Sequence, residues 1–132
     1  MGKLVNEGES DVLTKWIKDS YVTLYLGLYT NTTEPAETAD LASLTEPSGF
    51  GYARIALASA DWSIASAVND VIENLQKTFT ASGGTWGNCY GYFIGTTVDN
   101  TGLLLFVEHF SNGPYDVTDG SSVKITPSIT AA

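Results

Sequence analysis

The stretch CYGYFIGTTVDNTGLLLFVEHFS, residues 89–111, decides the fold of this 132-residue chain. Two apolar runs flank the segment VDNTG, whose Asn-Thr-Gly step is typical of tight turns. The stretch therefore predicts a β-hairpin with strands over 89–97 and 102–111. Because its apolar residues are densest over 103–107, this part predicts a central strand that is buried on both faces.

A further strand is predicted by YVTLYLGLYT, residues 21–30, where apolar residues recur with a period of two. One face carries the leucines and is expected to contact the core. The other face carries Tyr21, Tyr25 and Tyr29, which are amphipathic. This tyrosine face is expected either to be covered by another element or to meet a partner.

Outward from these strands, short apolar segments alternate with turn residues. A helix is an alternative for the segment AVNDVIENLQ, and ADLASL is expected to form one helical turn or a short edge strand. Gly49 and Gly51 in GFGYAR are expected to allow a bulge or tight turn. The remaining expected elements are strands over 51–58, 61–66, 71–81 and 121–130, a long polar connection over 30–50, and a loop over 111–120.

The N-terminal segment SDVLTKWIKDS predicts a short amphipathic helix over 11–19. Ser10 is expected to cap it, and Asp11 suits the positive end of the helix dipole. Its apolar stripe is Val12, Leu13, Trp16 and Ile17.

Six or seven strands separated by closely spaced turn signals are typical of an antiparallel sandwich or barrel. Of these two, the expected fold is the sandwich: all-β, an antiparallel β-sandwich of the jelly-roll or Ig-like kind with a short N-terminal α-helix. A chain of 132 residues suits one domain. It would consist of an N-terminal segment over 1–20 and a β-sandwich over 21–132.

The charge balance argues against two classes of partner. Fifteen acidic and six basic residues give a formal net charge of −9. No nucleic acid and no anionic membrane is expected as a partner, because both bind clustered Lys or Arg. The N-terminus MGKLVNEGESD has no apolar signal-peptide core, and no run approaches the roughly 20 apolar residues of a transmembrane helix. The chain is therefore expected to be made and kept in a cytoplasm, or to assemble there.

The single cysteine, Cys89, and the single histidine, His109, raise the possibility of a Cys/His catalytic pair. They lie on the two strands of the predicted hairpin and share a face in one of its two registers. No cation or helix start lies nearby to lower the pKa of the thiol. The expectation is therefore a buried cysteine, no catalytic residue and no enzyme.

No metal or cofactor is expected either. Cys89 and His109 would need two further ligands to hold a metal ion. The Asp-containing turns at 99–102 and 116–120 do not follow the calcium-loop pattern, and no nucleotide-binding glycine motif is present.

Several motifs resemble a family of small virion proteins of tailed bacteriophages. The clearest is LYLGLYTNTTEPAETADLASLTEPSGFGYARIAL, followed later by FTASGGTWG, GYFIGTT, LLLFVEHF and GPYDVTDGSSVKITPSI. The resemblance covers most of residues 22–130. It implies a small β-sandwich that is a structural component of the virion, often oligomeric and without enzyme activity.

This resemblance and the net charge together favour a capsid decoration or cement protein. It is expected to bind the major capsid protein or other virion proteins and to form a homodimer or homotrimer. The outer capsid surface is expected, because packaged DNA would repel a chain of charge −9. The alternative is a tail, fibre or adaptor component that contacts a glycan or receptor.

The abundance of Trp and Tyr predicts protein–protein contacts, since these side chains combine a large apolar area with a polar tip. A sugar-binding surface is the competing interpretation. The residues expected to contact a partner are Trp16, Tyr25, Tyr29, Pro35, Pro47, Trp86 and Tyr115.

Overall fold

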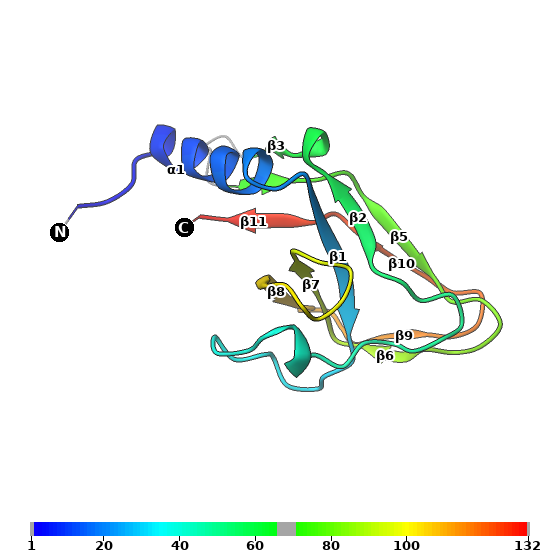
Figure 1. The fold of residues 1–132 in the computed structure, drawn as a ribbon. Coiled ribbons are helices and arrows are strands. Elements are labelled where there is room, and N and C mark those ends of the chain that lie inside the picture. The colour runs from blue at the N-terminus through cyan, green and yellow to red at the C-terminus, as the bar shows by residue number, and fades with distance from the viewer. Residues whose placement is uncertain (1, 66–70, 132) are drawn as a thin grey trace.

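The computed structural model describes residues 2–65 and 71–131 as antiparallel β-sheets preceded by a helix (Figure 1). The helical elements are α1 (Asn6–Leu13), the π-helix η1 (Thr14–Asp19) and the 3-10 turns η2 (Leu41–Ser43) and η3 (Ser59–Asp61). The strands are β1 (Thr23–Tyr29), β2 (Ile55–Ala58), β3 (Ser63–Ile64), β4 (Val71–Glu73), β5 (Lys77–Thr80), β6 (Gly87–Cys89), β7 (Gly91–Gly95), β8 (Leu104–His109), β9 (Tyr115–Val117), β10 (Ser122–Ile125) and β11 (Ser128–Thr130). The predicted all-β antiparallel fold with a short N-terminal helix is confirmed.

The largest sheet has the strand order β2-β1-β7-β8. It contains the predicted hairpin, in which β7 pairs antiparallel with β8. The prediction that 103–107 forms a central strand buried on both faces is wrong. Strand β8 lies at the sheet edge and is only half-buried, whereas β7 between β1 and β8 is buried throughout. Apolar density therefore did not reveal how many neighbours each strand pairs with.

Three smaller sheets contain the other strands, in the orders β11-β4-β3, β10-β5 and β6-β9. The predicted strand over 71–81 is interrupted between β4 and β5, which lie in different sheets. At the break Asn74 is buried and donates to the carbonyl of Ala58, while Leu75 is 59% exposed. The buried amide thus takes the place of the apolar residue that strict alternation would put inside.

Other predicted boundaries also change. The segment 89–97 is divided at Tyr90, because β6 pairs with β9 while β7 joins the large sheet. Strand β9 lies within the predicted loop 111–120, so that part of the prediction is wrong. The predicted strand 61–66 is reduced to Ser63–Ile64 after a 3-10 turn, and its residue 66 lies outside the described residues.

The leucine face of β1 contributes to the main core, as predicted. Leu24, Leu26 and Leu28 are at most 1% exposed and pack with apolar side chains of the smaller sheets, including Phe79 and Ile129. This gives the layered arrangement of a sandwich, with small sheets facing the larger one. Val22, which precedes β1, is 85% exposed and takes no part.

The tyrosine face of β1 is covered by another element. Tyr29 and Phe93 are buried with Leu41 and Leu44, which belong to the long connection between β1 and β2. The register of β1 and β7 explains how the Phe93 ring can pack here. Gly27 lies opposite Phe93 and, because it has no side chain, leaves room for the ring. Of the two alternatives for this face, the structure therefore gives the first for Tyr29, whereas Tyr25 is half-buried.

The N-terminal helix begins earlier than predicted, at Asn6, and Ser10 lies inside it instead of capping it. Acidic residues in its first turn suit the helix dipole. Leu13 and Ile17 are buried in the main core, as the stripe predicts, whereas Val12 and Trp16 are 43% and 38% exposed. Among the described residues, no helix has the length and apolarity needed to span a membrane.

Candidate functional site

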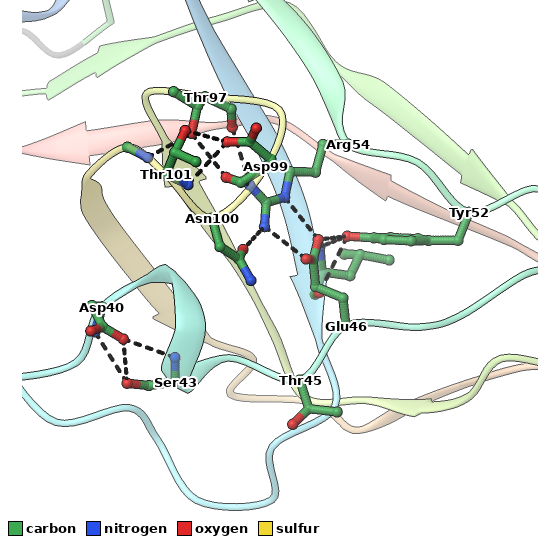
Figure 2. A network of polar contacts seen from close by, with 12 residues as sticks. Asp40, Ser43, Thr45, Glu46, Tyr52, Arg54, Thr97, Asp99, Asn100 and Thr101 are labelled. Atoms are coloured by element: carbon green, nitrogen blue, oxygen red, sulfur yellow. Dashed lines mark hydrogen bonds and ion pairs between the residues drawn. The ribbon is translucent and has the colours of Figure 1, made fainter.

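A network around Arg54 connects three segments of the chain (Figure 2). Arg54, just before β2, binds both oxygens of Glu46 through Nε at 3.0 Å and Nη2 at 2.8 Å. It also donates to the carbonyls of Thr97 and Asp99 and, at 2.7 Å, to Oδ1 of Asn100 in the β7–β8 turn. One guanidinium thus fastens the long connection to the tip of the hairpin.

This network is desolvated. The Arg54 side chain is 4% exposed, that of Glu46 is 20% exposed, and the guanidinium lies 5.0 Å from the centroid of the Phe93 ring. The Tyr52 hydroxyl donates a hydrogen bond to Glu46 at 2.6 Å. Burial is the largest cause that raises the pKa of this hydroxyl, and the hydrogen bond to the Glu46 carboxylate is the second. The hydrogen bond to Glu46 is the largest cause that raises the pKa of Arg54. The arrangement holds loops in place and exposes no nucleophile.

The glycine pair of GFGYAR forms the predicted turn. Gly49, Phe50 and Gly51 all have positive φ, and Tyr52 donates its amide to the carbonyl of Gly49. The indole of Trp86 donates to the carbonyls of Gly49 and Phe50 at 3.2 and 3.1 Å. Trp86 therefore anchors this turn from inside the molecule.

Cys89 and His109 do not face each other. Cys89 lies opposite Tyr115 and His109 lies opposite Gly91 in the respective strand pairs. Cys89 is fully buried, and burial, with a smaller effect of Asp116, raises the pKa of its thiol to about 11. His109 Nδ1 is 2.9 Å from the Tyr29 hydroxyl, and its ring stacks on Tyr90. Neither side chain is arranged for nucleophilic catalysis.

The carboxylates of Asp99 and Asp119 in the Asp-containing turns accept hydrogen bonds from within the chain. Asp99 accepts from the backbone and hydroxyl of Thr101, and Asp119 accepts from the amide of Gly83 at 2.9 Å. Within the described residues, no three His, Cys, Asp or Glu side chains lie close enough to hold a metal ion.

An open groove of about 720 Å³ lies between the large sheet and strands β9 to β11. Tyr92 and Glu108 share one face of the sheet because they are cross-strand partners, and Phe110 follows two residues later. The ring of Phe110 is 4.8 Å from that of Tyr115 and 6.3 Å from that of Tyr92. Val123 and Ile125 of β10 complete the apolar wall.

The exposure of the aromatic residues that line the groove increases from Tyr92 to Tyr115. Tyr92 is 4% exposed and its hydroxyl lies 3.4 Å from the backbone of Ser128. Burial raises the pKa of Tyr92, and the neighbouring Glu108 carboxylate adds to this effect. Tyr115 at the other end is 41% exposed. Aromatic surface and a carboxylate are therefore available to a ligand side by side.

The seven residues predicted to contact a partner are dispersed. Tyr29, Pro47 and Trp86 are buried within the chain, and Tyr29 and Trp86 pack in the two apolar clusters. Trp16 and Tyr115 are exposed, and Tyr25 and Pro35 are half-buried. The structure brings only Tyr115 into the groove.

Sequence reasoning missed both the Arg54 network and the groove. A usable signal for the network was that Arg54 is the only arginine of the chain and interrupts an apolar strand. No local signal indicated the groove, since Tyr92, Glu108 and Phe110 meet Tyr115 only through the pairing of distant strands.

Comparison with protein families places the chain among the structural proteins of tailed-phage virions, in agreement with the resemblance seen in its motifs. The chain belongs to the family described as Podophage GP4 fiber I protein gp80, whose model matches residues 18–129. No curated protein and no solved structure matches it. A fibre family agrees better with the fibre alternative than with capsid decoration.

Proposed function

We propose that this chain is a non-enzymatic structural subunit of a podophage tail fibre. The observation that carries the proposal is the match of residues 18–129 to a family described as a fibre protein. The buried Cys89 thiol, whose pKa is raised to about 11, supports a structural role, because a thiol nucleophile needs a lowered pKa.

In this role the chain associates with other virion proteins at the tail and forms a homo-oligomer. The whole chain acts as one domain. Its contacts involve the exposed aromatic residues Trp16 and Tyr115 and the half-buried residues Tyr25 and Pro35. Exposed Trp and Tyr suit such contacts because they bury a large area for a small loss of side-chain freedom.

Electron microscopy of virions that carry an affinity label on this protein tests the proposal. We expect label only at the tail, at a fixed position and with the copy number of the fibre. Label distributed over the head in capsid-lattice numbers would overturn the fibre proposal and support decoration of the major capsid protein. Absence of the protein from purified virions would contradict both.

A further inference from the structure

We propose that the groove formed by Tyr92, Glu108, Phe110 and Tyr115 binds an uncharged saccharide. The inference rests on the proposed function, which would place the groove on the exterior of the virion. Its volume of about 720 Å³ falls within the range of about 300–1,000 Å³ that is usual for small-ligand sites.

The aromatic wall suits the apolar C–H faces of a sugar ring. Phe110 and Tyr115 lie with ring centroids 4.8 Å apart, and Tyr115 is 41% exposed. Tyr92 and Phe110, 6.3 Å apart, continue the aromatic surface toward the buried end. A ligand on this wall would desolvate the exposed Tyr115 and the half-buried Phe110, whose rings already pack against each other, and this lowers the entropic cost of binding.

The polar part of the groove suits a ligand that is rich in hydroxyl groups. Glu108 is exposed and lies directly across from Tyr92 in the strand pair. Its carboxylate can accept two hydroxyl hydrogen bonds, and such charge-assisted bonds are stronger than neutral ones. The hydroxyl-bearing residues Ser121 and Ser128 also line the groove.

Charge selects an uncharged ligand over an anionic one. Glu108 and Asp116 line the groove against one cation, Lys124, and the chain as a whole carries a net charge of −9. A sialylated or phosphorylated sugar would meet like charge, locally and from the overall field.

The test uses the purified full chain on an array of neutral oligosaccharides with hexose, N-acetylhexosamine and deoxyhexose termini, with sialylated and phosphorylated oligosaccharides as comparison arms. We expect binding to at least one neutral oligosaccharide and none to the anionic ones. Tyr115→Ala and Glu108→Gln should each weaken this binding at least about tenfold. Tyr21→Ala and Glu37→Gln, a half-buried tyrosine and an exposed glutamate outside the groove, are the matched controls and should bind as the unaltered chain does.

The thermal unfolding of each variant is also measured by circular dichroism. If Tyr115→Ala proves to be misfolded, the sugar binding of Glu108→Gln alone tests the proposal. Binding to no neutral oligosaccharide, binding unchanged in both groove variants, or preference for anionic sugars would each overturn the proposal. The Glu108→Gln variant, which changes no residue proposed to contact other virion proteins, should lose sugar binding and still be incorporated at the tail. Failure of the saccharide site is thereby distinguishable from failure of the proposed fibre role, which the labelling of virions tests separately.

Discussion

Arg54 shows how one residue can hold two distant loops together. Its guanidinium makes a bidentate ion pair with Glu46 and is 4% exposed, so removing one partner leaves a buried charge without compensation. We expect Arg54→Leu to lower the free energy of unfolding by about 3–5 kcal/mol, measured by urea denaturation. Arg54→Lys should recover only part of this loss, because an ammonium cannot make the bidentate pair.

The control for this prediction is the surface pair Lys15–Asp11, whose side chains are 71% and 59% exposed. Lys15→Ala should change the free energy of unfolding by less than about 1 kcal/mol. Equal effects of the Arg54 and Lys15 substitutions would show that burial does not distinguish the two pairs.

Cys89 supplies a pH-dependent prediction at the same scale. Its pKa rises from 9.0 to about 11 in the fold, so the native thiolate fraction at pH 8 is about 100-fold smaller than in the unfolded chain. Reaction with a thiol-specific disulfide reagent should be slower in buffer than in concentrated urea by at least this factor. Rapid reaction of the native chain would contradict the burial of the sulfur.

The sign of the stability effect follows from the same shift. The folded chain keeps the Cys89 proton at a pH where the unfolded chain loses it, so the free energy of unfolding falls between about pH 9 and pH 11. The buried hydroxyls of Tyr29, Tyr52 and Tyr92, with raised pKa values, act in the same direction above pH 10. Cys89→Ala should remove only the cysteine part, visible as a shallower loss between pH 9 and pH 10.

At the scale of elements, the pairing of β1 with β7 depends on glycine facing aromatic residues. Gly91 lies opposite Tyr29, and a Cβ at Gly91 would come 2.3 Å from the backbone oxygen of Glu108, which cannot move away. We expect Gly91→Ala to cost about 3 kcal/mol of the free energy of unfolding. Urea denaturation checks this value.

Gly8→Ala in α1 is the matched control. The added Cβ would meet only the flexible end of Leu4, at 3.2 Å, and alanine is the better helix former. This variant should be more stable by about 0.5–1 kcal/mol. A destabilised Gly8→Ala together with a neutral Gly91→Ala would contradict both parts of the argument.

At the scale of the whole molecule, the N-terminal helix completes the main core although the family match starts only at residue 18. Removing residues 1–17 deletes Leu13 and Ile17, which are 1% and 0% exposed. At about 2–5 kcal/mol for each buried side chain, the loss approaches the total stability of a small protein. We expect the shortened chain to melt at a much lower temperature, or to be partly unfolded at 25 °C, by circular dichroism.

Removal of residues 1–5 is the control for this truncation. Residues 2–5 are exposed, and their loss should leave the melting temperature nearly unchanged. A chain without residues 1–17 that melts within a few degrees of the full chain would show that the helix packs on the core without stabilising it.

Features that depend on neighbouring residues could be read from the sequence. The alternation in β1, the turn between β7 and β8 and the buried pair Leu13 and Ile17 all follow from local spacing. Motif order along the chain was also sufficient to indicate a family of phage virion proteins, which the family match confirms.

Features that depend on which distant segments meet were decided only by the tertiary structure. The edge position of β8, the break at Asn74 and the burial of Tyr29 and Trp86 each depend on a partner far along the chain. The groove depends on the same kind of meeting, between the β7–β8 face and the strand that carries Tyr115. Local sequence sets which face of a strand is apolar, but the strand pairing determines what covers that face, because side-chain burial is a property of the assembled sheets.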